Sequence, residues 1–391
     1  MNEGPRSQRR AARQARARRR RRTAALAAVA VALAGGVLYL VDGRAAVRGR
    51  PAEAATHAAT PAAPSGRAAT ASRSARPAGT ATLAFAGDVH FTGRTADRLT
   101  ATPALGPLSS QLAAADFSMV NLESAITTRG TAQAKIYHFR TTPAALTALR
   151  DSGVDAVTMA NNHAVDYGPV GLADTLAAQQ TSPIPVLGIG PDASAAFRPY
   201  TTTVNGVRLA VLAASQVEDL TNAKYRAGAD TPGIASALDR PALLAAVRSA
   251  RAHADVVVVY LHWGVEGSSC PVADQTSLAT DLATAGATVV VGTHAHVMLG
   301  SGMLGSTYVA YGFGNFLWYG TSPYPHSDET GVTTVTVTRA GKVAGAVFTP
   351  ALVGGDGVPR AQSGDKAAGI TSRYDQLRRC ADLAPAPAAT S

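Results

Sequence analysis

Five of the nine histidines in this sequence stand where an apolar run ends, beside carboxylates or amides. The first case is the segment GDVHFTG, residues 87–93, which follows the apolar residues 82–86. Asp88 and His90 are two residues apart, and side chains with this spacing point to the same face of a strand. Taken alone, an aspartate after a glycine at a strand end is more often a turn or cap residue than a metal ligand. The rest of the chain must decide between the two interpretations.

Five further polar clusters follow later apolar runs. They are Asn121 to Glu123, Asn161 to His163 with Asp166, His262 to Gly264 with Glu266, Gly292 to His296, and Gly314 with Asn315. In open α/β sheets, ligands bind in the crevice beyond the carboxyl ends of the strands. We therefore expect these side chains to converge on one site.

The chemistry of these side chains favours metal ions. Imidazole together with carboxylate suits Zn, Mn and Fe, whereas all-oxygen sites suit Mg and Ca. The candidate ligands are Asp88, His90, Glu123, Asn162, His262, His294 and His296. They exceed what one four-coordinate ion needs, so we predict two divalent ions, with Glu123 as an anionic bridge. Two ions about 3.5 to 4 Å apart can stabilise both the attacking and the leaving oxygen of a displacement.

An alternation of strands and helices must position these residues. We expect strands at 82–87, 117–121, 154–160, 184–189, 207–213, 255–262, 287–292 and 307–312, and helices near 143–151, 169–180, 241–253 and 274–285. Continuous apolar runs such as 256–261 are typical of strands buried on both faces. Residues 333–338 and 343–348 alternate in polarity and predict an antiparallel hairpin. The pattern predicts one α/β domain with mixed sheets.

Almost all of the net positive charge lies at the N-terminus. The chain carries +10; residues 1–22 contain ten arginines and one glutamate, whereas the remainder has 26 basic and 25 acidic residues. A nucleic-acid-binding protein is expected to carry its basic residues on a folded face. We therefore expect no nucleic-acid partner.

Residues 23–41 predict a membrane anchor. These nineteen residues carry no charge, and as a helix they would cross about 28 Å of hydrocarbon. Because positive charge stays on the cytoplasmic side, the basic tail 1–22 would lie inside and the rest of the chain outside. A cleaved signal peptide is the alternative, since residues 52–54 resemble a small-x-small cleavage site, but signal peptides have apolar regions of only about 7 to 15 residues. We expect a single-pass cell-membrane protein with an extracytoplasmic C-terminal domain, secreted only if cleavage occurs.

The composition divides the remainder into a linker, a domain and an extension. Residues 42–80 are rich in Ala, Pro, Thr, Ser and Arg, and such a segment buries too little apolar surface to offset the loss of chain entropy. We interpret them as a disordered linker. Residues 81–352 form the folded domain, and residues 353–391 form a C-terminal extension with a frayed end.

The chain has two cysteines, Cys270 and Cys380. In an oxidising compartment such a pair can form a disulfide, and we favour this pairing. Two unrelated buried thiols are the alternative, because the sequence does not show whether the two Cα atoms come within bonding reach.

The motifs GDVHFTGR, NLES, NNHAVDYG, HWGVE, GTHAHV and YGFGNF, in this order and spacing, resemble the CapA family of capsule-synthesis proteins. That family is associated with poly-γ-glutamate and is similar to the calcineurin-like metallophosphoesterases. The resemblance covers residues 82–318. It implies a four-layer sandwich of two mixed β-sheets flanked by helices, with an active-site face outside the cytoplasm.

The resemblance also implies roles for individual residues. Asp88 and His90 match the Asp-x-His pair that binds the first metal, and Glu123 stands where the superfamily has a bridging Asp. Asn162 and His163 match an amide ligand followed by a general acid. His262 matches a lone ligand histidine, and His294 and His296 match a closing His-x-His pair. Two departures are the His at position 90, where many CapA-type sequences have an apolar residue, and the longer Glu123, which leaves the metal separation open.

Four further residues complete the expected site, each with a structural alternative. Asp166 would orient the His163 ring or stabilise the turn that follows. Arg94 would receive an anionic substrate group or form a surface ion pair. Glu266 would act on substrate or be solvated, and Asn315 would line the site.

Together these features predict a metal-dependent hydrolase that acts in synthesis, export or trimming of an anionic polymer. The substrate would be that polymer or a phosphoester, and the partners would be membrane polymer-synthase subunits. Two alternatives are a non-catalytic accessory subunit of such a synthase and a general secreted phosphodiesterase.

Overall fold

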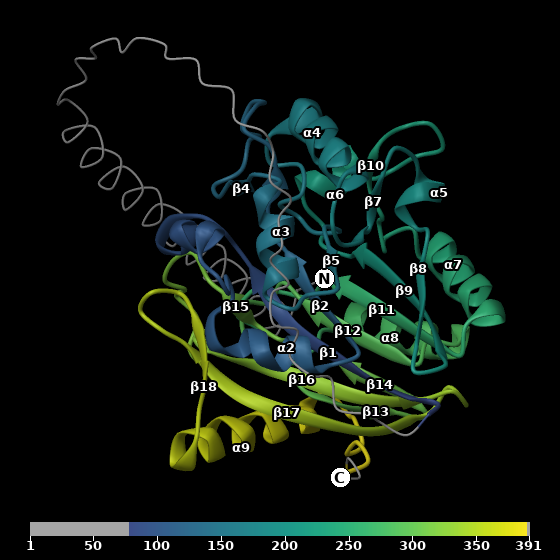
Figure 1. Cartoon of the computed structure of the whole chain (residues 1–391). Helices are drawn as coiled ribbons and strands as arrows, with labels where there is room; N and C mark the ends of the chain where they lie inside the picture. The colour runs from purple at the N-terminus through teal and green to yellow at the C-terminus, as the bar shows by residue number, and fades with distance from the viewer. Residues whose placement is uncertain (1–77, 389–391) are drawn as a thin grey trace, which may run out of the picture. The chain divides into compact units, whose positions relative to one another are not determined.

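A computed structural model of the chain describes residues 78–388 (Figure 1). The predicted basic tail, the predicted anchor at 23–41 and most of the predicted linker lie outside the described residues. Between residues 78 and 388, no helix is both long and apolar enough to cross a membrane.

The first of two large sheets contains eight strands and is mixed. Its order is β18-β17-β16-β1-β2-β5-β6, and β15 also pairs with β1. Strands β1, β2, β5 and β6 run parallel, whereas β16, β17 and β18 are antiparallel. The strands are β1 (Thr80–Val89), β2 (Phe117–Leu122), β5 (Ala156–Thr158), β6 (Val186–Leu187), β15 (Asn315–Leu317), β16 (Glu329–Thr338), β17 (Val343–Val353) and β18 (Pro359–Ala361).

The second sheet has six strands in the order β13-β14-β12-β11-β9-β8. Its four central strands are parallel and its edge strands are antiparallel. They are β8 (Tyr200–Val204), β9 (Val207–Ser215), β11 (Val256–His262), β12 (Val289–Thr293), β13 (Ser301–Leu304) and β14 (Thr307–Ala310). Two short ribbons pair β3 (Ala125–Ile126) with β4 (Arg140–Thr141) and β7 (Ile189–Gly190) with β10 (Gly233–Ile234).

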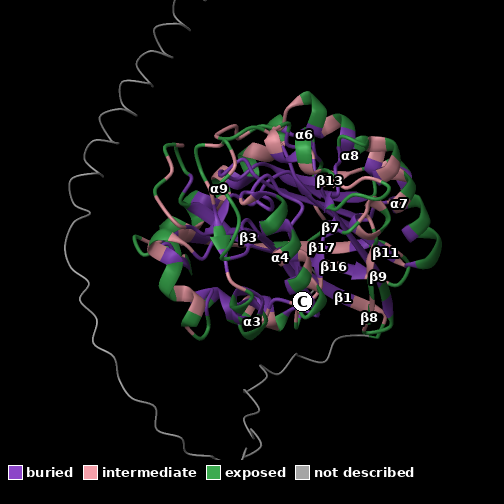
Figure 2. Ribbon diagram, turned by 90° about the horizontal axis from the view of Figure 1, so that it is seen from above, coloured by how far each residue is buried: buried purple, intermediate pink, exposed green. Residues whose placement is uncertain are grey.

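The two sheets pack face to face, and helices cover their outer faces. The core between the sheets joins Phe85 of β1 and Met119 of β2 to Val258 and Tyr260 of β11. A second core packs helices α2 (Ser109–Ala114), α3 (Ala144–Asp151) and α4 (Gly168–Gln180) on the first sheet, and a third packs α7 (Arg240–His253) and α8 (Ala273–Ala285) on the second. Figure 2 shows the buried strands in the centre and the exposed residues mainly on helices and loops. The predicted mixed α/β fold is therefore confirmed.

Most predicted elements lie where the sequence places them, but two predicted strands are too long. The strand expected at 154–160 is paired only over β5, and a turn follows before α4. The strand expected at 184–189 is divided into β6 and β7 at Gly188, whose φ of 77° breaks the extended backbone. Four helices were not predicted from the sequence, namely α2, α5 (Ala193–Ala196), α6 (Leu220–Tyr225) and the long α9 (Gly364–Cys380), nor were the 3₁₀ turns η1 (Gly93–Thr100) and η2 (Gly106–Leu108).

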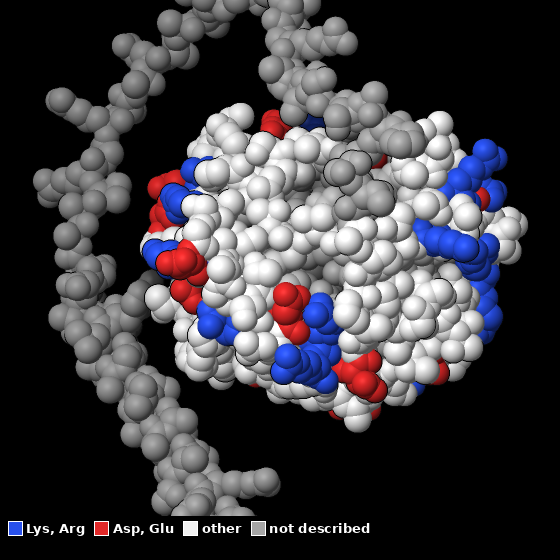
Figure 3. All heavy atoms as spheres, turned by 90° about the horizontal axis from the view of Figure 1, so that it is seen from below, with Lys and Arg blue, Asp and Glu red and all other residues white. Residues whose placement is uncertain are grey.

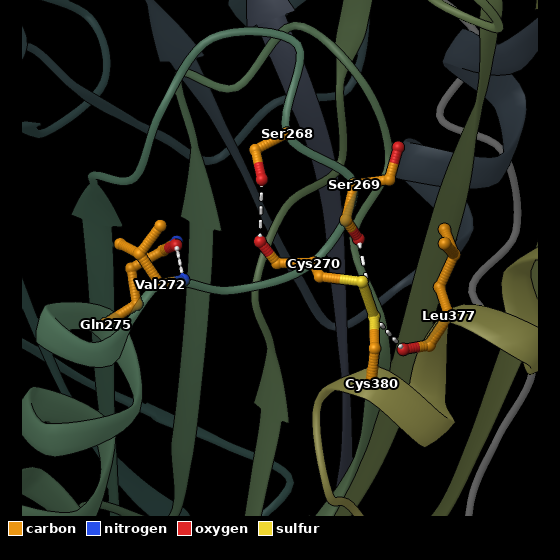
Figure 4. The surroundings of a disulfide bond; sticks show 7 residues. All are labelled: Ser268, Ser269, Cys270, Val272, Gln275, Leu377 and Cys380. Carbon is orange, nitrogen blue, oxygen red and sulfur yellow. Dashed lines mark hydrogen bonds between the residues drawn. A yellow bond between two sulfur atoms is a disulfide. The ribbon is translucent and has the colours of Figure 1, made fainter. Parts of the chain in front are cut away.

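The C-terminal residues continue the same fold. Strand β18 pairs with β17, and helix α9 (Gly364–Cys380) packs against β17 and β13, beneath β17 in Figure 1. Cys380, the last residue of α9, forms a disulfide with Cys270 in the loop before α8, with the two Cα atoms 5.7 Å apart (Figure 4). Arg373 of α9 forms a second link, an ion pair with the buried Glu329 at the start of β16.

Candidate metal centre

The predicted site forms where parallel strands of both sheets end. In the first sheet, Asp88 of β1 lies between Asn121 of β2 and Asn315 of β15. Strands β1 and β15 come together so closely that a Cβ atom at Gly87 would lie 1.9 Å from the carbonyl oxygen of Gly314. Glycine at position 87 is therefore a requirement of this strand contact, which fixes the position of Asp88.

Glu123 lies at the centre of the cluster and is fully buried. Its Oε2 atom is 3.2 Å from Nε2 of His90, and its Oε1 atom is 3.2 Å from Nε2 of His262 and 4.0 Å from Nε2 of His163. Burial alone would raise the pKa of Glu123, but the charge and hydrogen bond of His262 and the hydrogen bond of His90 hold it well below its usual range. Glu123 is thus an anion surrounded by imidazoles.

His262 connects the two sheets. It is the last residue of β11, and its Nε2 atom lies 2.9 Å from Oδ1 of Asn162 in the turn after β5. Its Nδ1 atom lies 3.0 Å from Oγ1 of Thr293 and 3.3 Å from Nδ2 of Asn121. Asn121 also donates to Oδ1 of Asp88 at 2.8 Å. Asn121 and Thr293 hold the candidate ligands in place, a role that the sequence analysis did not assign to them.

His294 and His296 follow β12 in a left-handed turn, with φ angles of 99° and 57°. Such angles are costly for residues other than glycine and are concentrated at functional sites. The backbone N–H of His294 donates to Oδ2 of Asp88 at 3.4 Å, and Nδ1 of His296 lies 3.5 Å from the same oxygen. Burial would lower the pKa of His296, but Asp88 and the charge of Glu123 raise it to about 9. Burial and the neighbouring histidines lower the pKa of His294 well below its ordinary value.

The cluster fits a divalent metal ion. Glu123, His294 and His296 each offer one ligand atom, and these atoms all lie within 4.8 Å of one another. Nδ1 of His90 and Nδ1 of His294 are buried without a hydrogen-bond partner. Unpartnered buried polar atoms are costly and rare, and a cation would satisfy them. The nitrogen and oxygen donors suit Zn, Mn or Fe, while the number of ions and their identity stay predictions.

His163 lies at the edge of this cluster in a hydrogen-bonded chain. Its Nδ1 atom is 2.7 Å from Oδ2 of Asp166, which is fully buried and also accepts from the backbone N–H of Phe139 at 2.7 Å. Its Nε2 atom faces Glu123. Burial lowers the pKa of His163 below its ordinary value, although Asp166 and Glu123 act in the opposite direction. Asp166 therefore orients the His163 ring.

Lys135 completes this chain and was not predicted. Its Nζ atom donates to Oδ1 of Asp166 at 2.7 Å and to the backbone oxygen of Asn162. It also lies 3.7 Å from Oδ2 of Asp219, which caps α6. Lys135 belongs to a segment without strand or helix periodicity, so no pattern in the sequence indicated its position.

Aromatic side chains form one wall of the centre. The ring centroid of His90 lies 4.4 Å from Phe139, 4.9 Å from Trp318 and 5.1 Å from Tyr319. Trp318 also lies 4.6 Å from His296. The motif YGFGNF ends just before Trp318, so the only sequence signal for this wall was its proximity to that motif.

The three predicted substrate-binding residues lie around the centre in different ways. Arg94 donates from Nε to the carbonyl of Trp318 at 3.0 Å and from Nη1 to that of Gly355 at 3.2 Å, and it lines a hollow of about 310 Å³. Glu266 is exposed and accepts from the Tyr324 hydroxyl at 2.8 Å. Asn315 is fully buried, with Oδ1 3.1 Å from Nδ1 of His296, so its contact here is with a candidate ligand.

Comparison with known proteins shows the family of this chain. Residues 82–319 match the family described as "Bacterial capsule synthesis protein PGA_cap". The chain is 33% identical over 208 residues to the PGA biosynthesis protein CapA of Bacillus subtilis, covering 52% of this chain and 54% of that protein. It is 32% identical over 195 residues to the probable polyglutamine synthesis accessory protein Rv0574c of Mycobacterium tuberculosis, covering 47% and 50%. The chain thus spans about half the length of the curated relatives it matches.

Among solved structures, a 5'-nucleotidase precursor from Thermus thermophilus aligns with 76% of this chain and 58% of its own, at 15% identity and a TM-score of 0.45. A score at this level does not establish a shared fold.

Proposed function

Because this chain belongs to the family of bacterial capsule synthesis proteins, we propose that it acts in the synthesis, export or trimming of an anionic capsule polymer such as poly-γ-glutamate. We propose further that it does so as a metal-dependent hydrolase of the metallophosphoesterase type, with the cluster around Glu123 as its active centre. The scissile bond is a phosphoester or an amide.

The observation that carries this proposal is the buried cluster of imidazoles and carboxylates. A purely structural core has no need for five histidines around a buried glutamate, and it would not leave two imidazole nitrogens, Nδ1 of His90 and Nδ1 of His294, without a partner. Strained backbone at His294 and His296 supports the same interpretation, because strain of this kind persists at functional sites.

Each group in the centre has a distinct task in the proposed reaction. Asp88, His90, Glu123, Asn162, His262, His294 and His296 would hold the divalent ions, which when bound supply Lewis acidity toward a phosphoryl or acyl oxygen. His163 carries the proton that the leaving group receives, at Nε2, because its Nδ1 atom is held by Asp166. The aromatic wall of Phe139, Trp318 and Tyr319 keeps water away from His90 and strengthens electrostatic interactions inside the centre.

The proposed location is the outer side of the cell membrane. The uncharged run 23–41 behind an arginine-rich tail supports a single-pass anchor. This location would bring the domain next to membrane subunits of a polymer synthase, which we propose as its partners. Fractionation of cells that express the full chain tests this point, since an anchored protein stays with the membrane in high salt and is released by detergent.

Metal analysis of the full chain purified in detergent tests the active centre. We expect about one to two equivalents of Zn, Mn or Fe per chain, and hydrolysis of a bis-aryl phosphate in the presence of Mn. His294→Ala should lose both metal and activity. His253→Ala, an exposed histidine on α7, is the matched control and should keep both. A wild-type protein that binds no divalent ion in any preparation would refute the hydrolase.

A non-catalytic accessory role is the second candidate. It is favoured by one observation, the name of the mycobacterial relative as a probable polyglutamine synthesis accessory protein. In that case the protein would bind polymer or co-purify with synthase subunits, and no substrate would turn over with any metal. His294→Ala would then leave polymer production in cells unchanged.

A further inference from the structure

Five basic side chains form an exposed group at the end of the molecule opposite the metal centre. We call this group the basic corner; its members are Arg208, Arg248, Arg251, Arg339 and Lys342. They come from three separate parts of the fold, namely the start of β9, the C-terminal half of α7 and the turn between β16 and β17. Favourable interaction of a cation with a helix C-terminus explains Arg251 on α7, but it does not explain the residues from the other two elements.

Contacts with one residue, Asp255, bring members of this group together. Arg208 forms an ion pair with Asp255 at 2.7 Å, and Arg251 donates to the backbone oxygen of Asp255. The charge of Arg339 also acts on Asp255 and helps to hold its pKa below the ordinary value, after the larger effect of Arg208. A Cβ atom at Gly341 would lie 3.0 Å from Nη2 of Arg251, which places the β16–β17 turn against α7. Three of the five basic residues, each from a different element, therefore act on the same residue, Asp255.

The basic corner lies at the amino ends of the parallel strands. Arg208 is the second residue of β9, whose last residue, Ser215, pairs with His262. Thr80 begins β1 and Asp88 lies near its end, which at 3.3 Å per residue separates them by about 26 Å. Basic side chains gather at the right-hand edge of Figure 3, the side on which α7 and β8 lie in Figure 1. The corner and the metal centre thus face in different directions.

The described chain begins beside this corner. The backbone N–H of Gly79 donates to the oxygen of Asn205 at 2.9 Å, and the backbone N–H of Arg339 donates to the oxygen of Gly79 at 2.8 Å. Only 36 residues separate residue 78 from the end of the uncharged run at residue 41. Thirty-six residues span at most about 120 Å even when fully extended. A bilayer that holds residues 23–41 would therefore be within reach of the corner.

The surface beside the corner is also hollowed. Between β8 and α7 lies a recess of about 320 Å³, and its lining includes Thr201, Thr203, Ser249, Arg208 and His253 together with apolar residues such as Leu209 and Ala250. Side chains of Thr, Ser and Arg can donate hydrogen bonds to a phosphate headgroup. The amino ends of β2 and β5 in the first sheet are different, because Asp151 and Asp155 lie there beside Arg150. The docking surface therefore comprises the amino ends of the second-sheet strands and the β16–β17 turn of the first sheet.

We propose that the basic corner docks on the headgroups of an anionic phospholipid bilayer, so that the metal centre faces away from the membrane. This proposal rests on the membrane attachment proposed above only for the presence of a bilayer close to the domain. The clustering of the five basic residues does not depend on that attachment. Each basic residue near an anionic surface contributes about a fivefold gain in affinity. Because these residues are exposed, the interaction weakens at high salt, where the screening length falls to about 3 Å at 1 M.

A fluorescence measurement on the full chain in nanodiscs tests the docking. The only two cysteines form a disulfide, so a single cysteine introduced as Ala340→Cys, in the β16–β17 turn, takes a fluorophore. A second protein carries the label as Ile136→Cys, near the metal centre. The discs contain a headgroup nitroxide quencher and either 30% or no phosphatidylglycerol. We expect quenching of the label at position 340 only in anionic discs and only at low salt, with little quenching at position 136.

Charge reversal provides the matched comparison. The triple variant Arg248→Glu, Arg339→Glu, Lys342→Glu leaves Arg208 and Arg251, which hydrogen-bond to Asp255, unchanged. It should lower the ratio of docked to undocked protein by roughly 100-fold. The control Lys224→Glu, Lys366→Glu, Arg379→Glu makes the same change in charge on other exposed sites and should leave quenching unchanged.

The outcomes separate this inference from the proposed anchoring and from a polymer-binding role. A chain that fails to incorporate into discs contradicts the anchor; docking is then read from quenching on anionic vesicles of the same composition. Incorporation with equal quenching in neutral and anionic lipid, or stronger quenching at position 136, overturns the docking. If the corner variant instead loses retention on immobilised poly-γ-glutamate with unchanged quenching, the corner binds polymer and the lipid proposal is wrong.

Discussion

At the scale of single residues, the centre depends on buried carboxylates that hold imidazole rings in fixed directions. Glu123 contacts His90 and His262, while Asp166 contacts His163. Asp166 differs from Glu123 because it also receives a lysine, Lys135, and a backbone N–H. This difference supports the proposed roles, namely metal binding for Glu123 and orientation of the proton carrier for Asp166.

Replacement of His163 should separate chemistry from metal binding. We expect His163→Asn to keep its metal content and its fold but to hydrolyse a bis-aryl phosphate about 10² to 10⁴ times more slowly. The loss should be smaller for substrates whose leaving group is a stable anion, because such a group needs little protonation. The protonated ring does this work, so the wild-type kcat should fall as pH rises through a midpoint below 6.5, since burial lowers the pKa of His163.

The measurements are the metal content, the hydrolysis rates over a series of leaving groups and the dependence of kcat on pH, each for the wild type and for His163→Asn. The falling limb should be absent from His163→Asn. Loss of metal from this variant, or an equal loss of rate on good and poor leaving groups, would show that His163 is not the proton donor.

Replacement of Lys135 should reveal the charge balance of Asp166. In Lys135→Met the fully buried Asp166 loses its only lysine partner among the described residues. We expect a loss of about 3 kcal/mol in the free energy of unfolding, because an uncompensated charge is left buried. The double variant Lys135→Met, Asp166→Asn should recover part of this loss, since the amide is neutral.

Urea unfolding provides the measurement, and Lys224→Met is the control at an exposed lysine, with an expected change within about 0.5 kcal/mol. Equal stability of Lys135→Met and Lys224→Met would mean that Lys135 does not balance Asp166.

At the scale of elements, the centre is assembled from strand ends and the turns that follow them. The ends of β1, β2 and β5 position Asp88 with His90, Glu123, and Asn162 with His163, and the ends of β11 and β12 position His262, His294 and His296. The contact between β1 and β15 leaves no room for a side chain at position 87, because Gly87 lies against the backbone of Gly314. A side chain there must push the two strands apart.

We therefore expect Gly87→Ala to lower the free energy of unfolding by more than about 3 kcal/mol and to reduce metal occupancy, since both Asp88 and Asn315 would shift. Gly320→Ala is the control, because a Cβ atom there meets nothing within 4 Å. Neither glycine has a positive φ, so the comparison isolates steric contact from backbone strain. Thermal unfolding and metal analysis of the two variants would contradict this account if they gave the same result.

At the scale of the whole described domain, α9 connects distant parts of the chain to the rim of the centre. The disulfide joins α9 to residues 264–272, which follow His262, and Arg373 joins α9 to Glu329. The cross-link encloses 110 residues, and a loop of this size restricts the unfolded chain strongly.

The variant Cys270→Ser, Cys380→Ser should lose about 4 kcal/mol in the free energy of unfolding. Hydrogen exchange should become faster in residues 264–272 and in the last turn of α9, whereas residues near Arg373 should change less because the ion pair remains. Wild-type protein treated with a reductant should reproduce the variant, and Ser268→Ala should not. Alkylation of either cysteine in unreduced protein would contradict the pairing.

The sequence by itself determined most of the strands of the two sheets, the family and the positions of the candidate ligands. Apolar runs such as 256–261 specify strands because a strand buried on both faces has no polar alternation. The order of the motifs indicated the family because ligand types and spacings are local properties of the chain. Asp88, Glu123 and His262 could be singled out since each directly follows such a run.

Only the tertiary structure decided which distant side chains meet. Lys135 joins Asp166, Trp318 lies between His90 and His296, and Cys380 reaches Cys270. None of these pairings leaves a periodic signal, because they depend on how two sheets and their loops pack in three dimensions. Packing sums many weak contacts over residues far apart in the chain, so it fixes the distance between two side chains, while the local sequence fixes only the element to which each belongs.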